Sequence, residues 1–265
     1  MLGKLLKYDN RSMFRLFLPL WAAILVLSFI NHFTLFRLFS STSMNLPKTV
    51  FLIAYILLVS AVCIISVVYI IQRFYSGLLR DEGYLMFTLP VKHWQLITSK
   101  LLTALLLVLC SIVVGVASAA LLAGNKFPWK EIFAWLREID WSFKSVLLLV
   151  LLILLLVFSV AKTVLHFYIS MAIGQLSNKR KVLCSVGAFF GISLILTTTV
   201  TTLFNSLLVA PAEDSWIYTL FRSVSDTPLD AALLSVGLYL VATLLQCAIF
   251  FFPTELLLRR KLNLE

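Results

Sequence analysis

Residues 73–100 read RFYSGLLRDEGYLMFTLPVKHWQLITSK and separate two strongly apolar stretches of this chain. The segment carries the basic residues Arg73, Arg80, Lys92 and Lys100, and an apolar patch at residues 84–89 follows its acidic pair. Each flanking stretch is long enough to cross a bilayer, since a spanning helix needs about 20 predominantly apolar residues. A short amphipathic segment held at the membrane surface is well suited to being bound by a soluble partner, as a helix in a groove.

The composition predicts an integral membrane protein. Of the 265 residues, 61% are hydrophobic and 13% are charged, whereas soluble domains average about 45–50% apolar and about 25% charged residues. This length accommodates about six spans with short connections and leaves no room for a sizeable soluble domain. The net charge of +10 would suit a nucleic-acid partner, but the basic residues gather at the ends of the apolar stretches, which favours a membrane protein without one.

The apolar stretches predict an all-α fold with six transmembrane helices. We expect spans at about 17–36, 50–72, 96–124, 145–173, 182–209 and 231–254. Residues 1–16 interleave basic and apolar residues at helical spacing, which predicts an interfacial helix. Residues 125–144 mix three Trp with charges of both signs and are expected to form another. The 210–230 segment is expected to be either a surface loop or a set of short re-entrant helices.

The distribution of Lys and Arg predicts the orientation of the chain. With six spans both termini lie on one side, which receives 14 of these residues against 7 on the other side. We therefore expect both termini and the 73–95 segment in the cytoplasm, and the acidic 210–230 segment outside.

The sequence lacks the common motifs of enzyme sites. It contains no GxxxxGK[ST], GxGxxG, HExxH or GxSxG. Its four cysteines lie in apolar stretches without metal-binding spacing, so we predict neither a disulfide framework nor a metal site. An ion-coupled carrier usually places an acidic residue at mid-membrane, and the spans contain almost no carboxylates. We expect neither an enzyme nor an ion-coupled carrier, and no cofactor in this chain.

Three polar features inside the spans are candidates for function. The first is Lys162, because a cation within a bilayer is costly unless its side chain extends to the interface. Gly187 and Gly191 form a GxxxG motif, which permits close approach of helices within one chain or between two. The fifth span is also the most polar, and we expect its side chains to line a pathway or pack on another helix unless they bond back to their own helix. Its polar residues are Thr197, Thr198, Thr199, Thr201, Thr202 and Asn205.

The 73–100 segment resembles the first cytoplasmic loop of six-span ABC type-2 transporter permeases, the membrane subunits of ATP-driven exporters with the type V fold. In that family an acidic residue precedes a short apolar stretch, then Pro, then a helix that re-enters the membrane with Lys near its start. The matching residues here are Asp81, Glu82, Tyr84, Leu89, Pro90 and Lys100. In layout the resemblance covers the whole chain, with residues 1–16 as the elbow helix and 210–230 as the extracellular re-entrant region. The 125–144 segment departs from the family, since it is longer and richer in Trp than a minimal outer loop.

The resemblance implies that residues 79–90 form a cytoplasmic coupling helix, which docks in a groove on a separate ATPase subunit. The coupling residues would be Leu79, Arg80, Asp81, Glu82, Tyr84, Leu85, Met86, Phe87, Leu89 and Pro90. Two ATPase copies would bind ATP and Mg²⁺, and a second permease copy or a relative would complete the path. The second and fifth spans would face each other across it, in a bacterial plasma membrane.

Two other classes of protein stay open. One is a non-transporting scaffold or sensor subunit of an antimicrobial-peptide resistance complex. The other is a channel or secondary carrier. A carrier should show matched halves, and no convincing internal repeat relates residues 1–130 to residues 131–265.

Overall fold

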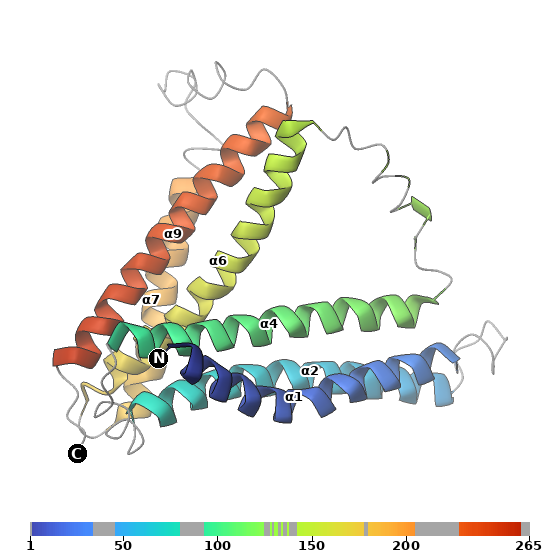
Figure 1. The fold of residues 1–265 in the computed structure, drawn as a ribbon, viewed down its shortest axis with the longest axis horizontal. Coiled ribbons are helices and arrows are strands. Elements are labelled where there is room, and N and C mark those ends of the chain that lie inside the picture. Colours follow the sequence, from blue (N-terminus) through green and yellow to red (C-terminus); the bar gives the residue numbers. More distant parts are fainter. Residues whose placement is uncertain are drawn as a thin grey trace. The chain divides into compact units, whose positions relative to one another are not determined.

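The computed structural model describes residues 2–33, 46–79, 93–124, 142–177, 180–204 and 228–260, together with positions 128, 130, 131, 134 and 137. Every regular element in these ranges is a helix (Figure 1). In chain order these are α1 (Leu2–Phe33), α2 (Leu46–Phe74), the short π-helix η2 (Tyr75–Leu79), α4 (His93–Ala123), α6 (Phe143–Gly174), α7 (Lys181–Phe204) and α9 (Pro228–Arg260).

Six of these helices are long and apolar enough to cross a membrane. Their candidate spans contain 19 to 32 residues, and at 1.5 Å per residue about 20 residues cover the roughly 30 Å hydrocarbon core. Large apolar side chains are exposed along all six, as expected of surfaces that face lipid. The prediction of an all-α, multi-pass membrane protein is confirmed at this level.

The N-terminus differs from the expected separate elbow helix. α1 runs without interruption from Leu2 to Phe33, and its candidate span already begins at Leu5. Met13, Phe17, Trp21 and Ile24 are all buried. Because they follow one another at helical spacing, a single stripe of apolar packing runs along the helix on both sides of residue 16.

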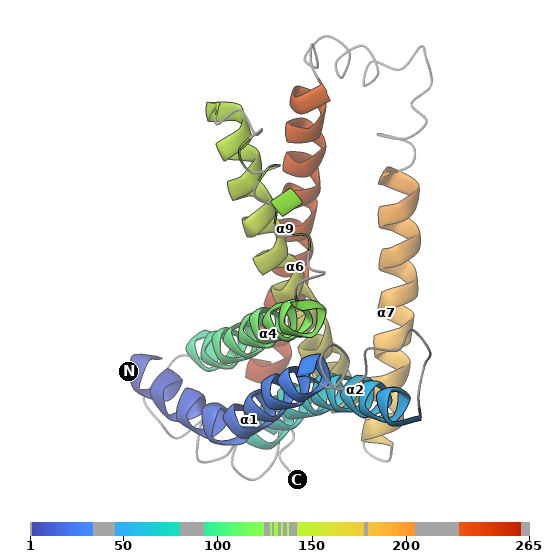
Figure 2. The ribbon, with the colours of Figure 1, turned by 90° about the vertical axis from the view of Figure 1, so that its right-hand side faces the viewer.

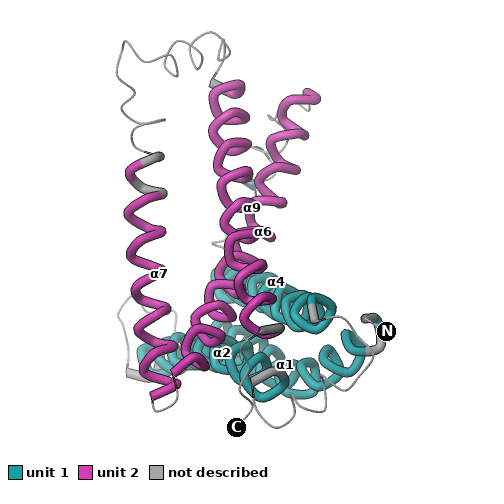
Figure 3. Tube along the Cα trace, turned by 90° about the vertical axis from the view of Figure 1, so that its left-hand side faces the viewer, with its two compact units in different colours: residues 1–77, 86–136 teal, residues 78–85, 137–265 magenta. Residues whose placement is uncertain are grey.

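The chain divides into two compact units (Figure 3). Unit 1 comprises residues 1–77 and 86–136 and contains α1, α2 and α4. These helices lie side by side (Figures 1 and 2), and α1 packs mainly on α4. Polar side chains join them: Trp21 Nε1 donates to Ser111 Oγ at 3.2 Å, and the hydroxyls of Tyr55 and Ser118 lie 2.8 Å apart. Such bonds between helices help packing in lipid, where burial of apolar surface contributes little.

Unit 2 comprises residues 78–85 and 137–265 and contains α6, α7 and α9. α6 packs along α9 and also against α7. A Cβ atom on Gly174 would collide with Ser185 Oγ and lie 2.7 Å from the carbonyl oxygen of Lys181, so glycine is required where α6 ends against α7. Lys144 Nζ and Asp230 Oδ1 form an ion pair of 2.8 Å, which places the beginnings of α6 and α9 at the same end of the unit.

Candidate functional site

Unit 1 contains a buried charge cluster, formed by Asp9 of α1, Arg73 of α2 and Lys100 of α4. Lys100 Nζ donates to the two carboxylate oxygens of Asp9 at 2.9 and 2.8 Å, and Arg73 Nη2 donates to Asp9 Oδ1. The side chains of Lys100 and Asp9 are 3% and 5% exposed, and that of Arg73 is 33% exposed. One carboxylate thus holds two cations and leaves the cluster with one excess positive charge.

The charge cluster lies where the chain leaves α2 and where it enters α4. Arg73 is the penultimate residue of α2, and the turn of π-helix that follows is of a kind frequent at functional sites. A Cβ atom on Gly77 would lie 3.4 Å from Lys100 Cε, so the lysine side chain passes this glycine in close contact. Through Asp9, both flanks of the predicted coupling stretch are tied to α1.

Of the predicted coupling residues, Arg80 to Pro90 lie outside the described residues, and Leu79 ends η2. Lys100, named by the family resemblance, belongs to the charge cluster. Asp9 was missed by the sequence analysis, although it is the only acidic residue among the first 80. A single acidic residue among many basic ones was the feature of the sequence that could have indicated that Asp9 forms ion pairs.

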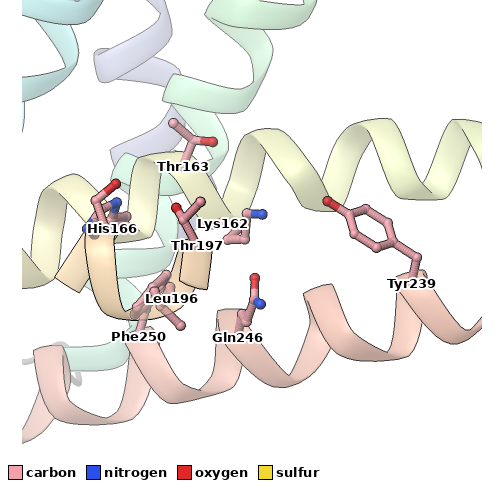
Figure 4. A pocket seen from close by; sticks show the side chains of 9 residues that line it. Lys162, Thr163, His166, Leu196, Thr197, Tyr239, Gln246 and Phe250 are labelled. Atoms are coloured by element: carbon pink, nitrogen blue, oxygen red, sulfur yellow. The ribbon is translucent and has the colours of Figure 1, made fainter. Parts of the chain in front are cut away.

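Unit 2 contains a cavity of about 280 Å³ between its three helices (Figure 4), which we call the α6 cavity. All but two of its lining side chains are polar. The lining residues are Lys162, Thr163 and His166 of α6, Ser193, Leu196 and Thr197 of α7, and Tyr239, Gln246 and Phe250 of α9. A polar cavity within membrane-spanning helices is costly unless it serves binding or passage.

The spacing of the lining residues places each set on one face of its helix. Lys162 and His166 are four residues apart on α6, and Figure 4 shows Lys162 near Thr197 and Gln246. The ring of His166 is stacked against Phe189 and Phe250, with centroid distances of 4.5 and 5.3 Å. This sandwich fixes the imidazole at one end of the cavity.

No carboxylate among the described residues pairs with Lys162. Asp230, an acidic residue at the start of α9, already pairs with Lys144. Within the same ranges no group of three or more His, Cys, Asp and Glu residues could hold a metal ion. The described lining therefore offers one cation among neutral groups, an arrangement that attracts anions.

The structure separates the predicted polar residues of the fifth span. Thr197 lines the α6 cavity, whereas Thr198 and Thr202 are exposed and donate back to the carbonyls of Leu194 and Thr198 at 2.9 and 2.8 Å. The side chain of Thr201 and the whole of Asn205 lie outside the described residues.

The GxxxG motif lies on the outer surface of unit 2. Gly187 and Gly191 are exposed, and a Cβ atom added to either would meet nothing within 4 Å. The motif therefore makes no close helix contact within the described chain.

The cavity residues of α9 were missed by the sequence analysis. The lining residues Tyr239 and Gln246 belong to a polar series that also includes Ser235 and Thr243, spaced at intervals of three or four residues. Such spacing places them on one face of a helix, so the sequence did contain an indication of a polar side.

Comparisons of the chain with protein-family models, with curated proteins and with solved structures find no match. The functional interpretation therefore depends on the charge cluster, the α6 cavity and the character of residues 73–100. The first two come from the described helices, and the third from the sequence.

Proposed function

We propose that this chain is the membrane-spanning permease subunit of an ATP-binding-cassette exporter. Six candidate spans and the resemblance of residues 73–100 to a permease coupling loop support this proposal. ATP hydrolysis would take place in a separate subunit, present in two copies, and a second permease chain would complete the path. No catalytic residue is assigned to this chain.

The observation that carries the proposal is the charge cluster, which joins the end of α2 to the beginning of α4, the two helices that flank residues 80–92. An ATPase that pulls on the 79–90 stretch must move the end of α2 and the beginning of α4. Asp9 joins Arg73 and Lys100 to α1, so α1 would move with them. Breaking the cluster would separate a buried ion pair, at a cost of about 3–5 kcal/mol. Force on the coupling stretch would therefore move the three helices together.

The proposal is tested by co-purification with the ABC ATPase encoded beside this chain. Leu85→Asp introduces a charge into the apolar patch of the coupling stretch, and Leu38→Asp makes the same change in the segment after the first span. We expect wild type and Leu38→Asp to bind the ATPase and stimulate ATP hydrolysis equally. Leu85→Asp should lose both properties, since a groove that receives an apolar helix face rejects a carboxylate.

Two results would contradict the proposal. One is no binding of the ATPase by the wild-type chain, and the other is equal binding by Leu85→Asp. A stable complex in which ATP is hydrolysed without movement of any substrate would instead favour the non-transporting scaffold or sensor subunit.

A further inference from the structure

We propose that the α6 cavity binds the headgroup of a membrane amphiphile with a single net negative charge, a phosphodiester or a carboxylate. Lys162 supplies the opposite charge. Binding follows from the cavity alone, whereas the identification of this amphiphile as exported cargo rests on the proposed function.

The charge of the cavity selects an anion. Lys162 is the only charged residue in the described part of the lining, and none of the described residues neutralises it. An uncompensated cation inside a bilayer is costly. A bound anion would remove much of that cost. A zwitterionic headgroup would bring a second cation, for which the described lining offers no carboxylate.

Three neutral side chains of the cavity lining are available for hydrogen bonds. Thr198, Thr199 and Thr202 each donate to a carbonyl of their own helix. In the described part of the chain, by contrast, Ser193, Thr197 and Gln246 have no hydrogen-bond partner and line the cavity. Figure 4 shows Thr197 and Gln246 near Lys162, so an anion beside the ammonium group would also meet these donors.

The size of the cavity selects a headgroup rather than a whole molecule. Its volume is about 280 Å³, below the roughly 300–1,000 Å³ of sites that enclose a drug-sized ligand. A phosphodiester or a carboxylate with its first few carbon atoms fits this space, and an acyl chain does not.

The surface beside the cavity can accept the acyl chain. Thr163 and Thr197 are exposed as well as lining the cavity, so the cavity opens at the outside of unit 2. Exposed apolar residues follow on both neighbouring helices, including Leu194 of α7 and Ile249 of α9. A tail lying on these residues would stay in the hydrocarbon region while the headgroup reached Lys162.

The experiment measures lipid binding to the purified full chain in neutral detergent micelles, by native mass spectrometry. Phosphatidylglycerol is compared with phosphatidylcholine of the same acyl chains, and oleate with oleyl alcohol. These two arms distinguish a phosphodiester from a carboxylate. Inorganic phosphate forms a third arm that has the anion without the tail.

We expect wild type to bind at least one anionic amphiphile at least tenfold more tightly than its uncharged or zwitterionic counterpart. Lys162→Met should abolish this preference, and Lys162→Arg should retain it. Lys181→Met removes one positive charge from the beginning of α7, outside the cavity lining, and should leave the preference unchanged.

A second matched pair tests the hydrogen bonds. Thr197→Val removes a hydroxyl that lines the cavity, and Thr199→Val removes one that bonds back to Ile195. We expect Thr197→Val to weaken binding of the anionic amphiphile several-fold and Thr199→Val to leave it unchanged. This pair and Lys162→Arg keep the proposal testable if Lys162→Met fails to fold.

Equal binding of both members in each lipid pair would overturn the proposal, as would equal effects of Lys162→Met and Lys181→Met. Inorganic phosphate that binds as tightly as the lipids would refute a site for an amphiphile. The assay contains no ATPase, so its failure leaves the exporter proposal standing. Failure of the ATPase experiment likewise leaves this binding site standing.

Discussion

The strongest prediction for unit 1 concerns the neutralisation of Asp9. Its carboxylate accepts hydrogen bonds from both Lys100 and Arg73, and Lys100 is only 3% exposed. In Asp9→Asn the lysine would lose the carboxylate that neutralises it, while its side chain stays shielded from water. Removing one member of a buried ion pair in this way costs about 3–5 kcal/mol, and we expect Asp9→Asn to lose that much stability.

Two further variants separate this effect from simple loss of packing. Lys100→Met leaves Asp9 paired with Arg73, so it should cost less than Asp9→Asn. The double variant Asp9→Asn/Lys100→Met removes both buried charges and should recover most of the loss, because neutral replacements of a buried pair are often tolerated. The double-mutant cycle of Asp9 and Lys100 should therefore give a coupling energy well above the roughly 0.3–0.5 kcal/mol by which independent sites depart from additivity.

The assay is equilibrium unfolding in mixed micelles with increasing SDS, followed by circular dichroism. Asp230→Asn is the matched control, because its partner Lys144 has a 54% exposed side chain that can turn to water. A pair whose cation reaches water contributes less than a fully buried one, so the control should change stability less than Asp9→Asn does. The reasoning is refuted if Asp9→Asn costs less than about 1 kcal/mol, or if the double variant loses the sum of the two single losses.

Two predictions concern helix packing. Gly174→Ala should destabilise unit 2 by about 1–3 kcal/mol, because its Cβ would collide with Ser185 and the backbone of α7, whereas Gly187→Ala meets nothing and should be neutral or stabilising in the same unfolding assay. Ser118→Ala removes the partner of the Tyr55 hydroxyl and should cost about 0.5–1.5 kcal/mol. The double variant Tyr55→Phe/Ser118→Ala should lose little more stability than either single variant. Additive losses would contradict a direct hydrogen bond between the two hydroxyls.

The spans could be predicted from the sequence because their apolar length is a local property. The interfacial character expected of residues 1–16 stays a prediction, and it came from composition alone, whereas the structure shows one continuous helix over Leu2–Phe33. Residues 1–16 look interfacial, yet Met13 packs in the same buried stripe as Phe17 and Trp21. Whether a helix continues past an amphipathic stretch is decided by the partners that its apolar face meets.

The candidate sites could be predicted only in part. Lys162 was identified by the cost of its charge, and Thr197 by the polarity of its span. The sequence could not say which threonines face inward, because that depends on the side of α7 that meets α6. Asp9 and Lys100 are separated by 91 positions in the chain, so their pairing exists only once α1 has packed on α4.

The two intramembrane lysines illustrate why a charge inside a span is not enough to identify a binding site. Lys100 is the more deeply buried of the two. Both carboxylate oxygens of Asp9 contact its ammonium group, so the charge of Lys100 is neutralised within the protein. Lys162 is only half-buried, yet it lines a polar cavity in which no described carboxylate faces it. A buried pair is expected to be rigid, since separating it leaves an uncompensated ion. An unpaired cation beside free hydrogen-bond donors gains stability from an added anion, so Lys162 rather than Lys100 is where a ligand should bind.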